Sequence, residues 1–85
     1  MILNMTTKEF SEMSVASKKK LFSYVLNSKV QNIVSWSMTN EKWGEYRVRH
    51  DEYAYSNLKI EPSKLGLTKV SVYNFETGEW EDEAR

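Results

Sequence analysis

The sequence predicts a single α+β domain in which one or two N-terminal helices pack on a three- to four-stranded antiparallel sheet, arranged as a meander. Two observations lead to this prediction. Apolar residues recur at helical spacing within residues 1–29, and they alternate with polar residues, as in a strand, within residues 30–85. A chain of 85 residues is also long enough for only one small core. We therefore expect a helical part, residues 1–29, and a β part, residues 30–85, which ends in an acidic hairpin or tail.

The first helix is predicted from a capping box at its start. In TTKE, residues 6–9, the Thr6 hydroxyl can accept a hydrogen bond from the Glu9 amide while the Glu9 side chain reaches back to the Thr6 amide. The helix should therefore begin at Thr7. Further along, Ser14 either caps a second helix or marks a bend in one long helix, so residues 7–27 form one helix or two.

The second helical stretch, SVASKKKLFSYVLNS, has one apolar side and one charged side. Its apolar stripe at helical spacing consists of Leu21, Phe22, Val25 and Leu26. The lysines of residues 18–20 spread over about 200° of the helix surface. We interpret them as the solvated side of an amphipathic helix rather than as a phosphate site.

The β part is predicted to open with a hairpin. In NIVSWSMT, residues 32–39, Val34, Trp36 and Met38 alternate with polar residues. The turn NEKWG follows, and alternation then resumes in EYRVRH, residues 45–50. On this register Tyr46 and Val48 should be buried, with Arg47 and Arg49 exposed on the opposite face.

Further strands are predicted on either side of a turn. Leu58 and Ile60 indicate a short strand, and EPSKLG, residues 61–66, contains Pro62 and Gly66, which a strand interior does not tolerate. TKVSVYNF, residues 68–75, has the pattern of a strand. In the ETGEW that follows, Gly78 should form the bend of a tight turn.

Composition limits the class of function. The formal net charge is zero, which argues against a dedicated nucleic-acid binder. There is no cysteine, so disulfides and thiolate metal sites are excluded, and a reducing cytoplasm is the expected compartment. We find neither a signal peptide nor an apolar run long enough to span a bilayer. No cofactor, metal site or catalytic residue is predicted.

The stretch WGEYRVRHDEYAY, residues 43–55, has three interpretations. The first is nucleic-acid contact, made by residues that could share one face: Arg47, Arg49, Tyr53 and Tyr55. The second is catalysis by His50, the single histidine. Strand alternation turns Asp51 away from it and leaves Glu52 on its side, but no nucleophile motif follows. The third is a half-buried strand without a site, and we favour it because such strands are common.

Within this stretch, the run Tyr46-Arg47-Val48-Arg49 is similar to the Tyr-Arg-Val run in the central strands of RelE-type toxins. These are small ribosome-dependent mRNA endonucleases in which helices precede an antiparallel sheet. The resemblance implies RNA as the target, with Tyr46, Arg47 and Arg49 as the contacting residues. A nucleic-acid-directed protein, either an RNase of this kind or an RNA- or DNA-binding domain, is therefore the alternative to the leading hypothesis given below.

The leading hypothesis is a small non-enzymatic binding module that inhibits or adapts another macromolecule. Its tryptophans and tyrosines exceed what so small a core can bury, and both residue types dominate interface energetics. The expected partner-binding residues are Trp43, Trp80, Glu79, Glu81, Asp82 and Glu83. A protein with a basic surface is the expected partner, and self-association stays open. The alternative for Trp80 is packing on Tyr73 or Phe75 across the ETG turn.

A further hint comes from composition. Lys, Asn, Tyr, Phe, Ile and Met are abundant, whereas Gly, Ala, Arg and Pro are scarce. The first set is encoded by AT-rich codons and the second by GC-rich codons. With the small size, this composition suits a viral protein, encoded by a bacteriophage and acting on host machinery.

Overall fold

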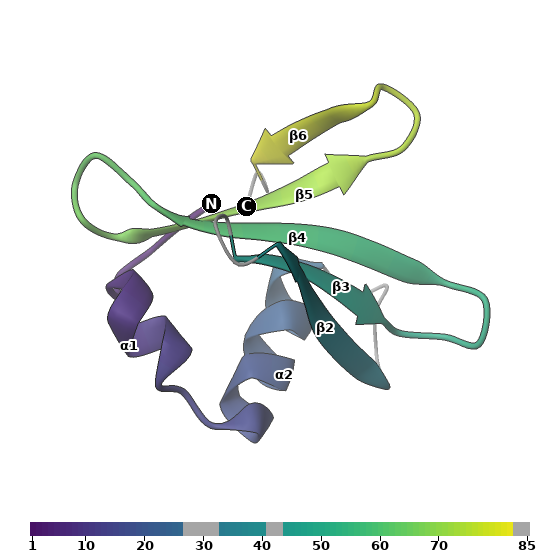
Figure 1. Cartoon of the computed structure of the whole chain (residues 1–85), viewed down its shortest axis with the longest axis horizontal. Coiled ribbons are helices and arrows are strands. Elements are labelled where there is room, and N and C mark those ends of the chain that lie inside the picture. The colour runs from purple at the N-terminus through teal and green to yellow at the C-terminus, as the bar shows by residue number, and fades with distance from the viewer. Residues whose placement is uncertain (27–32, 41–43, 83–85) are drawn as a thin grey trace.

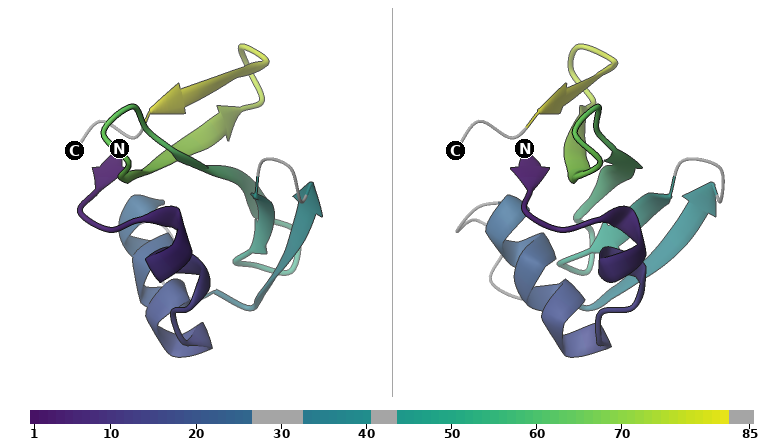
Figure 2. Two further views of the ribbon diagram at one scale, coloured as in Figure 1. Left: turned by 60° about the vertical axis from the view of Figure 1, so that its left-hand side comes forward. Right: turned by 90° about the vertical axis from the view of Figure 1, so that its left-hand side faces the viewer.

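The structure is a computed structural model that describes residues 1–26, 33–40 and 44–82. Along the chain the elements are β1 (Ile2–Leu3), α1 (Thr7–Ser11), α2 (Val15–Val25), β2 (Ser35–Asn40), β3 (Glu45–Arg49), β4 (Tyr55–Pro62), β5 (Thr68–Asn74) and β6 (Glu79–Asp82). Both helices lie on the same side of one twisted sheet (Figures 1 and 2).

The predicted fold class is wrong. Within the described residues the sheet has six strands rather than three or four, in the order β1-β5-β4-β3-β2, with β6 also paired to β5. Strand makes up 43% of the structure and helix only 22%, so the sheet dominates. The sheet is also more than a meander, because β1 precedes the helices and pairs antiparallel with β5. A strand of two residues is too short to show alternation, and for this reason the sequence did not reveal β1.

The two N-caps predicted from the sequence are confirmed. The Glu9 amide donates to Thr6 Oγ1 at 3.1 Å, and α1 begins at Thr7. The Thr6 hydroxyl in turn donates to Glu9 Oε1 at 3.2 Å, in place of the predicted bond from the Thr6 amide. Ser14 caps α2 by accepting from the Ser17 amide at 3.2 Å. The question that the sequence left open is thus settled in favour of two helices.

The strand pairing follows the local predictions closely. β2 and β3 form an antiparallel hairpin in which Trp36 lies opposite Val48. β4 runs over eight residues to Pro62, longer than the predicted short strand, and a turn leads from it to β5. Gly78 has φ +73°, a left-handed conformation that glycine adopts without strain, and it precedes β6.

The core lies between the helices and the face of the sheet that we call the inner face. Phe22 of α2 is fully buried, and its ring centroid lies 5.5 Å from that of Tyr46, 5.5 Å from that of Trp36 and 6.1 Å from that of Phe10. The core residues are Leu3, Phe10, Phe22, Val25, Ile33, Tyr46, Val48, Leu58, Ile60 and Val70. As predicted, Tyr46 and Val48 are buried, and Arg47 and Arg49 are exposed.

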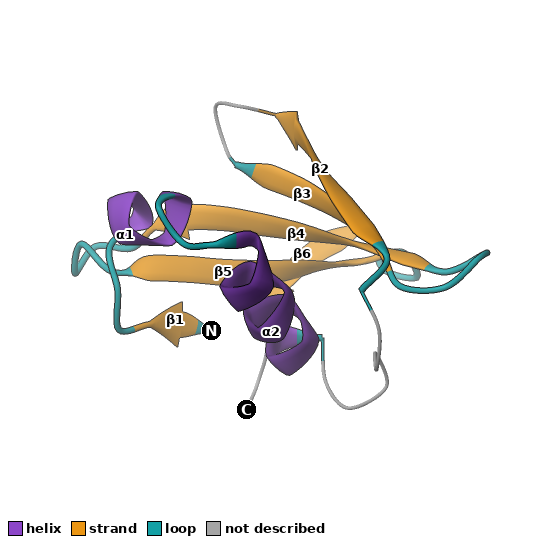
Figure 3. Ribbon diagram, turned by 90° about the horizontal axis from the view of Figure 1, so that it is seen from below, coloured by secondary structure: helices purple, strands orange, loops and turns teal. Residues whose placement is uncertain are grey.

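The opposite face of the sheet, which we call the outer face, carries the side chains that alternate with the core positions. The helices do not cover it; Figure 3 views the molecule from the helical side. Register brings the outer-face residues of neighbouring strands together, with Arg49 opposite Tyr55 and Arg47 opposite Asn57. Between β5 and β6, Tyr73 lies opposite Trp80.

Candidate binding surface

A row of aromatic rings crosses the outer face from β4 to β6. The centroids of Tyr55 and Phe75 are 6.2 Å apart, those of Phe75 and Tyr73 are 5.0 Å apart, and those of Tyr73 and Trp80 are 5.2 Å apart. Every contact is edge-to-face, the arrangement that the ring quadrupoles favour. We call these four side chains the aromatic row. Each strand from β4 to β6 thus contributes to one continuous apolar surface.

The aromatic row has a cation on the ring at each end. Arg47 Cζ lies 3.8 Å from the centroid of Tyr55, and Lys59 Nζ lies 4.9 Å from the centroid of Trp80. Exposed contacts of this kind contribute about 0.5–1 kcal/mol each. Among the described residues, the one salt bridge joins Lys69 and Asp82 at 3.5 Å. Arg47 therefore has no carboxylate partner in the part of the chain that the structure describes.

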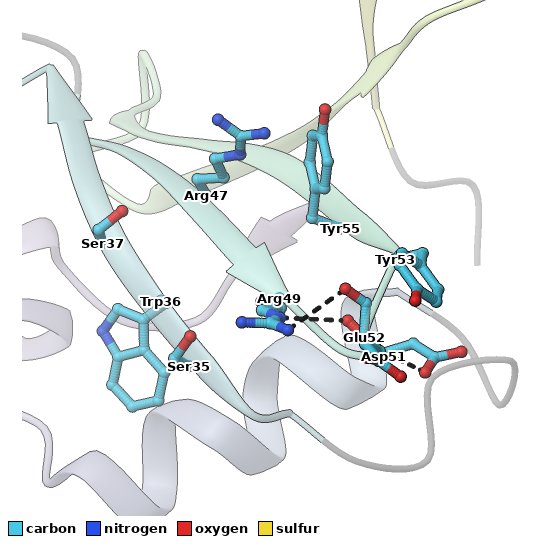
Figure 4. A pocket seen from close by; sticks show the side chains of 9 residues that line it. All are labelled: Ser35, Trp36, Ser37, Arg47, Arg49, Asp51, Glu52, Tyr53 and Tyr55. Carbon is cyan, nitrogen blue, oxygen red and sulfur yellow. Dashed lines mark hydrogen bonds between the residues drawn. The ribbon is translucent and has the colours of Figure 1, made fainter.

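A hollow of about 490 Å³ opens beside Arg47 at the β2–β3 side of the outer face. Figure 4 shows the side chains around it, with Arg47 beside Tyr55 and Arg49 beside the turn that joins β3 to β4. The residues that line the hollow are Ser35, Trp36, Ser37, Arg47, Arg49, Asp51, Glu52, Tyr53 and Tyr55. Its size falls within the range of small-ligand and nucleotide-sized sites.

Arg49 holds the turn at the end of this hollow. Its Nε donates to the carbonyl of Asp51 at 3.3 Å, and one terminal nitrogen donates to the carbonyl of Glu52 at 3.2 Å. Because both acceptors are neutral, Arg49 keeps its positive charge uncompensated by these bonds. Tyr53 lies at the tip of the same turn and is 88% exposed, so its ring is available to a partner.

The four residues of the nucleic-acid interpretation therefore do come together. Arg47, Arg49, Tyr53 and Tyr55 all line the hollow, because the turn after β3 reverses the chain and brings Tyr55 opposite Arg49. Tyr46, which the toxin resemblance implies as a contact, lies on the inner face instead and is 6% exposed. Burial there raises the pKa of its hydroxyl above 10.0, through desolvation of the ionised form.

The predicted partner-binding segment is divided between the two faces. Trp80 packs edge-to-face on Tyr73, which was the alternative interpretation of this residue. Its neighbours Glu79 and Glu81 point to the other face of the hairpin, where Glu81 Oε1 accepts from Asn74 Nδ2 at 3.1 Å. Asp82 returns to the outer face beside Lys69. The remaining two expected residues, Trp43 and Glu83, lie outside the described residues.

His50 lies apart from the aromatic row. Its Nε2 is 3.1 Å from Ser56 Oγ, and Ser56 is the register partner of the buried Val48. An imidazole beside a hydroxyl becomes a nucleophilic pair only with a carboxylate to orient the ring and donors for an oxyanion. No described carboxylate is hydrogen-bonded to His50. Nor do the described residues include a group of three or more potential metal ligands.

Reasoning from the sequence missed Tyr73, Phe75 and Lys59 as surface residues of interest. The spacing of Tyr73 and Phe75, two positions apart, indicated one shared face. That this face is also the face of Arg47 depends on the pairing of β3 with β4 and of β4 with β5. A single strand pattern does not contain that information.

Comparisons with protein-family models, with curated proteins and with solved structures found no match. The similarity to RelE-type toxins thus depends on the short run from Tyr46 to Arg49 alone. No helix in the described part of the chain has the length and apolar character needed to cross a membrane.

Proposed function

We propose that the protein is a small non-enzymatic cytoplasmic binding module that docks another macromolecule through its outer face, as an inhibitor or an adaptor. One observation carries the proposal, namely the aromatic row with a cation on its ring at either end. Phe75 is 60% exposed and Tyr55 is 44% exposed, although the inner face already supplies a complete core. Exposed aromatic rings that the core does not need are typical of interaction surfaces.

The chemistry of these side chains supports binding rather than catalysis. A guanidinium group donates hydrogen bonds but is not deprotonated in proteins, and neither it nor an aromatic ring is a nucleophile. Both are effective at interfaces, because Tyr, Trp and Arg carry a large share of binding energy when a partner desolvates them. Their edge-to-face contacts also hold the rings in place before a partner arrives, which reduces the entropy cost of docking.

The proposal can be tested by capture from a cell lysate with three forms of the protein. These are the wild type, the double variant Arg47→Glu/Tyr55→Ala, and the control Lys20→Glu, which changes one exposed cation of α2 on the helical side. We expect a species that the wild type and the control both retain and that the double variant loses. Circular dichroism must show the same folded spectrum for all three. Equal retention by all three forms would contradict docking through the outer face.

A further inference from the structure

We infer that the macromolecule docked on the outer face is a single-stranded nucleic acid, bound with its bases on the aromatic row and its phosphates beside Arg47 and Arg49. This inference rests on the proposed function and specifies the ligand. It comes from two features of the outer face: the guanidinium group of Arg47 on the ring of Tyr55, and the spacing of the aromatic rings.

The Arg47–Tyr55 stack is a ready platform for a base. At 3.8 Å from the ring centroid, the guanidinium group is in van der Waals contact with Tyr55, which covers one of its sides. The other side can receive a base, since nucleobases stack on guanidinium planes as they do on aromatic rings. The N–H groups at its edge have no described carboxylate partner and suit the oxygens of a phosphate.

The aromatic row extends this platform. Its rings come from β4, from the end of β5 and from β6, and successive centroids lie 5.0–6.2 Å apart. A single strand can place successive bases on such a surface, since every base has a π-face and stacking needs no particular sequence. A duplex cannot, because its bases are stacked on one another. The outer face therefore favours single strands.

Three cations of the outer face can contact phosphates. Arg47 and Arg49 lie at the hollow, and Lys59 lies over Trp80. Of the acidic residues, Glu79 and Glu81 alternate to the opposite face, whereas Asp82 pairs with Lys69 on the outer face and Asp51 and Glu52 line the hollow. Charge alone therefore does not select the ligand, because the chain is neutral as a whole and the hollow contains two carboxylates beside its two arginines. Three phosphate contacts would give a slope of about −2 for log K against log salt, at ~0.7 per phosphate.

Neutral polar side chains complete the surface at the hollow. Ser37 lies opposite Arg47 on β2, and Ser35 lies opposite Arg49. Their hydroxyls can donate to or accept from the edges of an unstacked base. An acidic protein segment would use the arginines equally well, but it would gain less from four rings in a row. The rings therefore decide between the two ligands.

The test is fluorescence anisotropy with labelled single strands of about 12 nucleotides, a length within the usual site sizes. Oligothymidylate and oligouridylate serve as probes, with a duplex of equal length for comparison, in ~50 mM salt. We expect both single strands to bind and the duplex to bind at least tenfold more weakly. Tyr55→Ala and Phe75→Ala should each weaken binding by about 5- to 150-fold, the loss of one base stack.

Charge variants separate stacking from simple attraction. Arg47→Gln should weaken binding and reduce the salt slope by about 0.7, whereas Lys20→Gln on α2 should change affinity less than twofold. Inorganic polyphosphate should compete poorly, because it has charge without bases. Effective competition by polyphosphate together with full affinity of Tyr55→Ala would overturn the inference, since binding would then be only electrostatic.

Failure of this inference and failure of the proposed function give different results. If no probe binds the folded wild type, single-stranded nucleic acid is not the ligand. Should the lysate experiment then show a protein that the Arg47→Glu/Tyr55→Ala variant loses, docking through the outer face still holds. If no probe binds and no captured species depends on Arg47 and Tyr55, both the inference and the proposed function are wrong. Since Tyr55 and Phe75 are exposed, their replacement should leave a folded protein to measure, and either variant alone suffices for the test.

Discussion

Replacing Phe22 with alanine should remove a quarter or more of the stability of the fold. Phe22 of α2 joins both helices to the sheet, since its centroid lies 6.1 Å from that of Phe10 on α1 and 5.5 Å from that of Tyr46 on β3. A third ring, that of Trp36 on β2, stands perpendicular to it at 5.5 Å. No atom of Phe22 is solvent-exposed. The substitution therefore opens a cavity in the centre of the core and breaks three aromatic contacts at once.

The magnitude follows from these contacts. Truncation of a fully buried phenylalanine to alanine costs about 3–5 kcal/mol. The whole free energy of unfolding of a domain of this length is about 4–13 kcal/mol, at ~0.05–0.15 kcal/mol per residue. The variant should thus lose between a quarter and all of its stability. Where it still folds, its melting temperature should fall by at least about 12 °C, since each kcal/mol shifts it by ~4–8 °C.

Urea unfolding followed by far-UV circular dichroism measures this loss, with thermal melting as a second measurement. The matched control is Val15→Ala, which truncates an apolar side chain that is 61% exposed at the start of the same helix. Its midpoint should stay within error of the wild type or rise slightly, because alanine is the better helix former. A loss below about 1 kcal/mol for Phe22→Ala, or equal losses for both variants, would refute the described packing of α2 on the sheet.

Four other predictions test separate parts of the structure. Thr6→Ala should lower the free energy of unfolding by about 1 kcal/mol, through loss of the N-cap of α1; an unchanged urea midpoint would argue against this cap. Val48→Ala should cost a few kcal/mol and Arg47→Ala less than about 1 kcal/mol, and the reverse ranking would indicate a register shifted by one residue. Trp80→Ala should lower the melting temperature by about 4–8 °C per kcal/mol of lost packing on Tyr73, and an unchanged value would mean that this packing contributes nothing. Burial raises the pKa of the Tyr46 hydroxyl, so this tyrosine ionises at lower pH in the unfolded state than in the folded state. Its contribution to the free energy of unfolding is therefore complete below about pH 10 and is lost at higher pH. When stability is measured against pH, Tyr46→Phe should show a smaller alkaline loss than the wild type.

The sequence predicted those features that depend on neighbouring residues. The caps at Thr6 and Ser14 involve residues three positions apart, and the burial of Tyr46 and Val48 follows from alternation within β3. The turn between β5 and β6 combines the positive φ of Gly78 with hydrogen bonds from nearby backbone amides to Asn74. Such features arise from a few adjacent side chains and backbone groups, so a local pattern is sufficient to predict them.

Features that depend on distant parts of the chain were not predicted. β1 exists because Ile2 and Leu3 meet Lys69 and Thr68, a pairing that only the folded sheet provides. The aromatic row likewise requires the registers of β4 with β5 and of β5 with β6. The sequence placed Arg47 and Arg49 correctly on the exposed face of β3, but it gave no sign that Tyr73 and Phe75 share that face. The sequence therefore predicted the arginines and tyrosines of the hollow, but not the part of the aromatic row formed by Tyr73 and Phe75.

Stability and binding are separable on this sheet, except at one residue. The inner-face residues hold the fold through complete burial, whereas Tyr55 and Phe75 keep much of their surface exposed and have little packing to lose. Trp80 belongs to both groups, because it packs on Tyr73 and also receives Lys59 over its ring. A weak-binding Trp80 variant would thus be ambiguous, since hairpin and surface would change together. Tyr55 and Phe75 are the residues at which binding can be measured without disturbing the core, and for that reason the surface should be judged by them.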